Sequence, residues 1–159
     1  MAVYSATGRT VVTAATADHC IAELWNPAAD PKGIIVWEVT ISVTIEGVGV
    51  IRPYLTRATA QGTAGSTVTP DGDNCWAGDN EAPPSATVLS LAAFTVQPTL
   101  ATPAHQGTVL TNVTGNTGMG HTWLLSRGLT LRAGHGLAIC QTTANATPPS
   151  DVTFVWEEP

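Results

Sequence analysis

The chain has 159 residues, which suits one domain, and only 11% of them are charged, against about 25% in ordinary soluble domains. The net charge is −6 with six basic residues and no basic cluster, which argues against nucleic acid and against anionic membrane surfaces as partners. The opening residues lack the features of a signal peptide, and no run of about 18 apolar residues exists. We therefore expect a protein made in the cytoplasm that does not span a bilayer.

Threonine takes the place of charge in this composition. The chain has 25 Thr beside many Ala and Val, and 15 Gly and 11 Pro punctuate it. Thr and Val are β-branched and fit a pleated sheet better than a helix, so the composition predicts short strands joined by turns. A surface of Thr, Ala and Gly costs less to desolvate than a charged one. This favours a subunit of an assembly, with a lone secreted β-domain as the alternative.

In chain order, residues 1–9 are interpreted as an extended N-terminal arm. Strands are then predicted at 10–16, 19–25, 34–45 and 50–60, with a turn at 26–33 where Pro, Asp and Gly gather. The clearest strand is 34–45, whose predicted dry face is made of Ile35, Trp37, Val39, Ile41, Val43 and Ile45. Pro53 cannot donate a ladder hydrogen bond, so strand 50–60 is expected at a sheet edge or with a bulge.

The second half begins with a long loop at 61–84, which is rich in Gly, Asp, Asn and Pro. Further strands are predicted at 87–96, where a short helix is the alternative, and at 108–114, 121–131, 136–143 and 152–157. The pair 121–131 and 136–143 is expected to form a hairpin through residues 132–135, which would let His121 face His135. Eight or nine strands without a clear helix predict an all-β, jelly-roll-like β-sandwich that occupies residues 1–159 as a single domain.

The sequence contains no recognisable catalytic constellation. The four His residues have no zinc-ligand spacing, and the GxSxG and phosphate-loop motifs are absent, so we expect no enzyme, no catalytic residue and no cofactor. A weak calcium candidate consists of Asp71, Asp73 and Asp79, although Cys75 and Ala77 stand where oxygen ligands are needed.

The three cysteines, Cys20, Cys75 and Cys140, are interpreted as buried or loop thiols. A disulfide between Cys20 and Cys140 requires their strands to lie side by side, which the sequence does not show.

The interface candidates lie in the long loop and in the N-terminal arm. They are Trp76, Asp73, Asn74, Asn80, Tyr4 and Arg9. Trp76 is the expected exposed anchor, whereas Trp37 and Trp156 are expected in the core because they alternate with polar residues. The alternative function is a carbohydrate-binding or receptor-binding domain, with Trp76 beside Asp73, Asp79 and Asn80 as its binding patch.

Several segments resemble small virion proteins of tailed bacteriophages. They are AELWNPAAD at 22–30, APPSATVLSL and VQPTL within 82–100, GLTLRAGHGLAI at 128–139 and FVWEE at 154–158, in the same order over most of the chain. The resemblance implies a β-sandwich virion protein, on the phage head or in a tail fibre, without catalytic residues to carry over. We expect a capsid decoration protein on the head surface. Its expected partners are the major capsid protein and copies of itself, with a homotrimer expected from fold analogy.

Overall fold

The computed structural model describes residues 2–10, 19–29, 32–43, 52–63, 68, 85–90, 94–101, 107–108, 119–142 and 149–159. Within these ranges it contains ten strands. They are β1 (Ala2–Arg9), β2 (His19–Asn26), β3 (Ile34–Val43), β4 (Pro53–Ala60), β5 (Thr87–Ser90), β6 (Thr99–Leu100), β7 (Gly107–Thr108), β8 (Met119–Leu131), β9 (His135–Gln141) and β10 (Ser150–Glu158).

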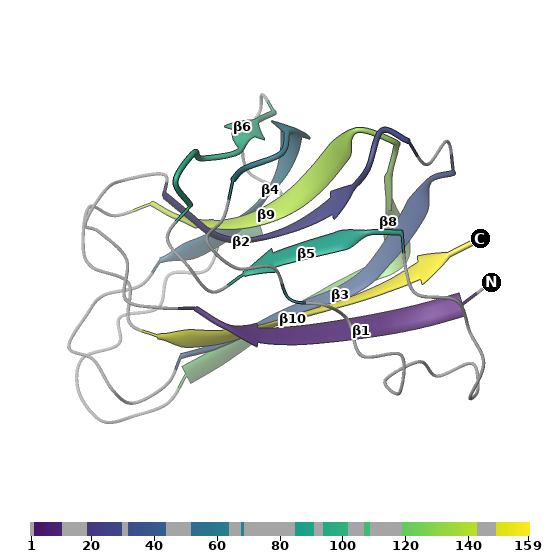
Figure 1. Ribbon diagram of the computed structural model, residues 1–159. Coiled ribbons are helices and arrows are strands. Elements are labelled where there is room, and N and C mark those ends of the chain that lie inside the picture. Colours follow the sequence, from purple (N-terminus) through teal and green to yellow (C-terminus); the bar gives the residue numbers. More distant parts are fainter. Residues whose placement is uncertain are drawn as a thin grey trace.

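The strands form two antiparallel sheets that pack face to face (Figure 1). A four-stranded sheet has the order β1-β10-β3-β8, and a six-stranded sheet has the order β5-β2-β9-β4-β6, with β7 also paired to β4. The chain alternates between the sheets from β1 to β4 and again from β8 to β10. The first and last strands are neighbours, so the N and C termini lie side by side. This alternation confirms the predicted jelly-roll-like sandwich. That residues 1–159 form one domain stays a prediction.

The N-terminal segment forms a strand, so the expected arm at residues 1–9 is wrong. β1 pairs with β10 along its whole length, from Ala2 opposite Glu158 to Arg9 opposite Asp151. The physical reason is that Tyr4 and Ala6 alternate with polar residues and point into the core. The strand predicted at 10–16 is not observed at Thr10, which follows the end of β1, and its other residues lie outside the described ranges.

The predicted hairpin between 121–131 and 136–143 is also wrong. β8 belongs to the four-stranded sheet and β9 to the six-stranded sheet, so the turn between them crosses the sandwich. Gly134 in this turn has a φ of 71° and donates its N–H to the Asn26 carbonyl at 2.9 Å. β8 pairs instead with β3, and β9 lies between β2 and β4, so His121 and His135 do not face each other.

A β-bulge in β3 divides the predicted dry face. Its C-terminal half is confirmed, since Val39, Ile41 and Val43 are buried. In the N-terminal half, Ile34 and Val36 are buried in place of Ile35 and Trp37. Against β10, β3 has one extra residue, Trp37, between Val36 and Glu38, and this bulge exchanges the two faces. The register against β8 shifts at the same place, where Val36 lies opposite Leu129 and Glu38 opposite Leu124. Ile45 lies outside the described residues.

Pro53 takes neither of the positions expected for it. It is the first residue of β4, a strand that pairs with β9 on one side and with β6 and β7 on the other. The start of a strand tolerates a residue without an N–H, so β4 needs neither an edge position nor a bulge at Pro53.

The main core lies between the two sheets. Trp156 and Phe154 of β10 are fully buried there, and the ring of Tyr4 stacks on Trp156 at 5.7 Å between centroids. The core position expected for Trp156 is confirmed.

A second cluster covers the far side of the six-stranded sheet. It contains Cys20, Tyr54, Phe94, Ala138 and Cys140, with Leu100 packed against it. Cys20 and Cys140 are opposite each other on β2 and β9 and form a disulfide, which corrects the expectation of free thiols for these two residues. Cys75 lies outside the described residues.

Candidate interaction surface

The outward side of the four-stranded sheet, which we call the outer face, is open to solvent. Strand alternation places on it Val3, Ser5, Thr7 and Arg9 of β1, Asp151, Thr153, Val155 and Glu157 of β10, Ile35, Glu38, Thr40 and Ser42 of β3, and Gly120, Thr122, Leu124 and Thr130 of β8. All of these residues are exposed or half-buried. The far side of the other sheet is covered by the cluster around Phe94, so the two sheets differ in what they present to solvent.

A row of four threonines crosses the middle of the outer face. The strand registers align Thr7, Thr153, Thr40 and Thr122 on the four neighbouring strands. The hydroxyl oxygens of Thr7 and Thr153 are 2.8 Å apart, and those of Thr40 and Thr122 are 2.9 Å apart. The hydroxyls therefore bond to each other in pairs, and the row is polar and uncharged. Thr40 donates its proton to the Glu38 carboxylate at 3.1 Å and so accepts from Thr122, which means that a partner covering this part of the row also meets that carboxylate.

Two large apolar side chains lie beside the threonine row. Leu124 is 72% exposed and sits opposite Glu38, the residue that follows Trp37 in the bulge. Trp37 is 37% exposed, where the sequence had predicted a core position, because the bulge turns it outward. Exposed Trp side chains are frequent anchors of protein interfaces.

The indole of Trp37 is held in place from two sides. Its N–H donates to Glu157 at 3.1 Å, and its ring edge lies 3.5 Å from where a Cβ of Gly128 would stand. Gly128 has a φ of 68°, and a Cβ there would also collide with Ile35. A Cβ at Gly128 would therefore clash with Ile35 and would meet the Trp37 ring only at ordinary contact distance, while the bond to Glu157 orients the indole.

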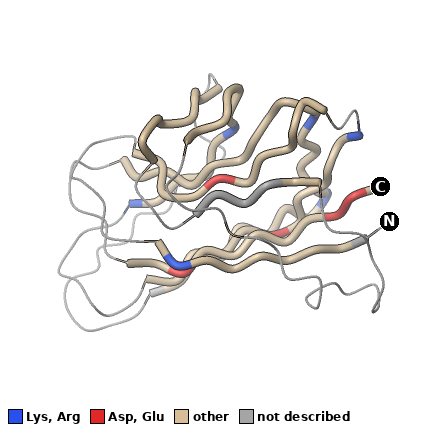
Figure 2. Tube along the Cα trace, viewed as in Figure 1, with Lys and Arg blue, Asp and Glu red and all other residues tan. Residues whose placement is uncertain are grey.

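Charges are sparse on both sheets (Figure 2). At one end of the outer face, the Arg9 guanidinium makes a bidentate pair with Asp151, with distances of 2.8 and 3.0 Å. The hydrogen bond from Arg9 lowers the pKa of Asp151. Arg9 thus remains an interface candidate, although its charge is already compensated. Tyr4 does not, because it is buried against Trp156.

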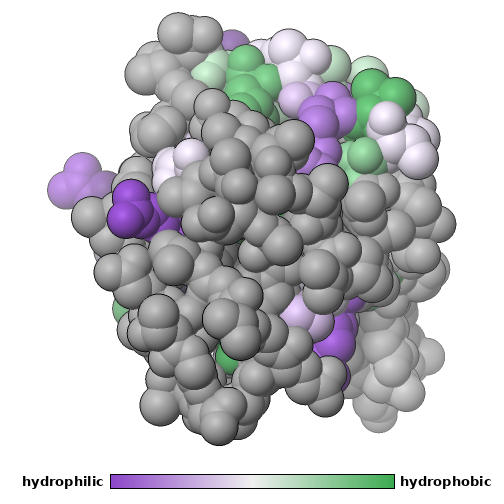
Figure 3. Space-filling model, turned by 90° about the vertical axis from the view of Figure 1, so that its left-hand side faces the viewer, coloured by the Kyte–Doolittle hydropathy of each residue, from purple (hydrophilic) through white to green (hydrophobic). Residues whose placement is uncertain are grey.

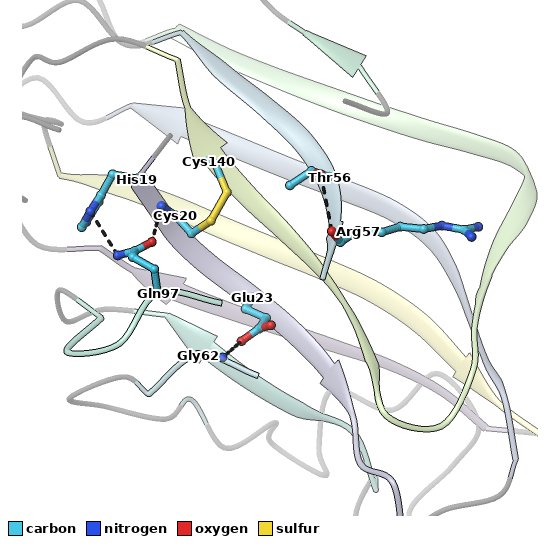
Figure 4. Close-up of a disulfide and its surroundings, with 8 residues drawn as sticks. All are labelled: His19, Cys20, Glu23, Thr56, Arg57, Gly62, Gln97 and Cys140. Atoms are coloured by element: carbon cyan, nitrogen blue, oxygen red, sulfur yellow. Dashed lines mark hydrogen bonds between the residues drawn. A yellow bond between two sulfur atoms is a disulfide. The ribbon is translucent and has the colours of Figure 1, made fainter. Parts of the chain in front are cut away.

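The covered face of the six-stranded sheet holds buried polar groups (Figure 4). Gln97 accepts the N–H of Cys20 at 2.8 Å and donates to Nδ1 of His19 at 3.1 Å, and burial lowers the pKa of His19. Glu23 accepts the N–H of Gly62 at 3.0 Å. Burial raises the pKa of Glu23 to about 7, and the bond from Gly62 opposes this rise. These contacts attach two loop segments to the sheet.

The loop residues predicted as sites are not described by the structure. Trp76, Asp73, Asn74 and Asn80, together with Asp71 and Asp79 of the calcium candidate, lie outside the described ranges. Their interface, metal and carbohydrate roles therefore stay predictions. Among the residues that are described, no three His, Cys, Asp or Glu side chains gather in a way that could hold a metal ion.

The outer face was missed as a site because strand register is not visible in a sequence. Alternation does place Thr40 and Thr153 on the wetter sides of their strands, which is the only signal available before folding.

Figure 3 looks at the end of the sandwich that is on the left in Figure 1. There the larger groups of described hydrophobic side chains lie in two places along the upper edge, with hydrophilic ones between them, and small parts of others show lower down. Among the described residues, no helix is long and apolar enough to cross a membrane.

Comparison with known proteins finds no family for this chain and only a distant likeness to solved structures. No family model matches the chain, and no curated protein matches it. Among solved structures, a chain from deformed wing virus carrying the GFP gene is 7% identical over 98% of this chain and 77% of its own length, with a TM-score of 0.32. A chain from the KBV activated particle at acidic pH is 8% identical over 100% of this chain and 68% of its own, with a TM-score of 0.31. Likeness at this level carries no argument, so the fold assignment rests on the strand order and the resemblance to tailed-phage proteins stays a prediction.

Proposed function

We propose that this chain is a structural virion protein, and specifically a capsid decoration protein that stabilises a tailed-bacteriophage head by binding between major capsid proteins. The observation that carries the proposal is the outer face of the four-stranded sheet. It combines an uncharged, internally bonded threonine row with two exposed apolar side chains, Leu124 and Trp37. Such a surface suits adhesion to another protein surface, and it includes no group poised for chemistry.

The energetics favour many weak contacts over one strong site. Burying Leu124, now 72% exposed, would contribute about 1–2 kcal/mol, and Trp37 a similar amount. Covering these side chains also covers the carboxylates of Glu38 and Glu157, which accept hydrogen bonds from Thr40 and from the Trp37 indole, so their desolvation offsets part of the gain. One copy would then bind modestly, whereas an oligomer that engages several capsid subunits binds tightly through avidity. We infer a homotrimer, on fold analogy alone.

The disulfide and the pairing of the first and last strands support the same role. The Cys20–Cys140 disulfide joins β2 to β9 across 120 residues of chain, and both termini end in paired strands. Disulfides persist in oxidising surroundings, which include the surfaces of virions. A protein that works by holding its neighbours together benefits from a scaffold that does not open locally.

The first test is mass spectrometry of purified virions with copy-number measurement. A decoration protein should be present in hundreds of copies and a fibre component in a few. Its absence from particles would overturn the proposal.

The second test asks whether the outer face makes the contact. Leu124→Glu should weaken binding to capsids that lack the protein by tenfold or more, because it places a charge where an apolar side chain is buried. Ala60→Glu is the matched control, since Ala60 is an exposed strand residue of the other sheet. Equal melting temperatures would show that both variants fold. Binding of Leu124→Glu at wild-type strength would exclude the outer face as the interface.

A further inference from the structure

A cavity of about 170 Å³ opens where β8 passes into β9. The described residues that line it are Arg57, Thr130, Leu131, Arg132 and His135. Three of the five carry basic side chains and none is a carboxylate. In a chain with a net charge of −6 and only six Lys and Arg, two of the arginines meet at this one cavity.

The crossing of the chain between the sheets brings these side chains together. Arg57 lies on β4 opposite Leu137 of β9, and its side chain extends away from the disulfide region (Figure 4). Arg132 and His135 flank the crossing turn, in which the N–H of His135 donates to the Arg132 carbonyl at 3.1 Å. The basic groups therefore come from one strand and one fixed turn.

The cavity residues keep hydrogen-bond donors for a ligand. Within the described part of the chain, neither Arg57 nor Arg132 takes part in an ion pair, in contrast to Arg9, which pairs with Asp151. Nδ1 of His135 donates to the Ala133 carbonyl at 3.1 Å, so in the neutral ring Nε2 is an acceptor, and the donors available to an anion are those of Arg57 and Arg132. Two guanidinium groups at one cavity repel each other, and an anion between them relieves that repulsion.

We propose that this cavity is a binding site for a small oxyanion, a carboxylate or a phosphate group. Guanidinium groups bind both by paired N–H···O bonds. The volume fits such a group, because sites for larger ligands usually occupy about 300–1,000 Å³. The site is independent of the role proposed for the outer face, since it lies at the end of the sandwich and uses none of the same residues except Thr130.

The test is titration of the intact, oxidised protein with inorganic phosphate and with N-acetylglutamate amide, followed by calorimetry or by NMR. We expect saturable binding that weakens about tenfold or more in Arg57→Gln and in Arg132→Gln. Arg127→Gln is the matched control, because Arg127 is an exposed arginine of β8 that does not line the cavity, and it should bind as the wild type does. Melting curves check that each variant folds.

The two probes distinguish the source of the anion. Tighter binding of phosphate indicates a free ion, and tighter binding of the glutamate compound indicates an acidic side chain of a neighbouring protein; both results support the site. Absence of saturable binding by either probe overturns it, as does binding that survives in both cavity variants or is lost equally in Arg127→Gln.

Discussion

Glu23→Gln should remove a loss of stability that the wild-type protein suffers as the pH rises from acid to neutral. The Glu23 side chain is fully buried on the covered face of the six-stranded sheet. One carboxyl oxygen accepts the N–H of Gly62, and the other has no partner among the described residues. Burial disfavours the charged form and raises the pKa to about 7.

The sign follows from comparing the folded and unfolded chains. A Glu in the unfolded chain titrates near 4.5, whereas folded Glu23 keeps its proton until about pH 7. Below the lower value Glu23 is protonated in both the folded and the unfolded chain, so its ionisation does not change the free energy of unfolding. Between the two values the unfolded chain loses its proton first, so stability falls with rising pH, and the loss is complete above the folded pKa. A rise of this size corresponds to roughly 3 kcal/mol.

The assay is denaturant unfolding of the oxidised protein at several pH values from acid to mildly alkaline. Gln keeps an oxygen for the Gly62 N–H and has no charge to bury, so the variant should exceed the wild type in stability above neutral pH by about 2–3 kcal/mol. Glu157→Gln is the control, because it removes a carboxylate of the outer face and leaves Glu23 in place. The fall due to Glu23 should persist in that control. If Glu23→Gln shows the same fall as the wild type, the buried carboxyl is not its source.

Three further outcomes are expected. Reducing the Cys20–Cys140 bond, or replacing both residues with Ala, should cost about 3–5 kcal/mol in denaturant unfolding, because the bond closes a long loop in the unfolded chain; no change on reduction would mean that the bond is absent. Gly128→Ala should lower stability by about 2–4 kcal/mol, since it combines a left-handed backbone with a collision, whereas Gly134→Ala, whose Cβ would meet nothing closer than 3.6 Å, should cost only about 1 kcal/mol. Equal losses of stability in the two variants would show that the collision at Gly128 contributes nothing. Trp156→Ala should cost about 3–5 kcal/mol in the same assay, and a cost below 1 kcal/mol would show that the Trp156 position is not core.

Alternation predicted the strand content well and the faces only in part. In β3, Val39, Ile41 and Val43 lie on the predicted dry face, but the bulge exchanges the faces before them and exposes Trp37. A bulge depends on how the neighbouring strands pair, and the local sequence does not carry that information.

Strand partners were less predictable than strands. A short turn between two β-rich segments favours a hairpin, yet β8 pairs with β3 in one sheet and β9 pairs with β2 and β4 in the other. The disulfide depends on the same knowledge, since Cys20 and Cys140 become neighbours only when β2 pairs with β9. Long-range pairing also creates the threonine row. Residue spacing along the chain therefore predicts neither the disulfide nor this row.

The contrast between the two exposed regions gives a last prediction about salt. The outer face has paired hydroxyls, apolar side chains, one compensated ion pair and two carboxylates, Glu38 and Glu157, that are hydrogen-bonded to Thr40 and Trp37, so it offers salt few charges to screen. Capsid binding through this face should therefore change by less than about threefold between low and high NaCl. Oxyanion binding at the cavity of Arg57 and Arg132 should fall steeply over the same range, because two cationic side chains supply its attraction. Measuring both on one protein sample separates the surfaces without any mutation, and a steep salt dependence of capsid binding would show that charged groups outside the outer face carry the contact.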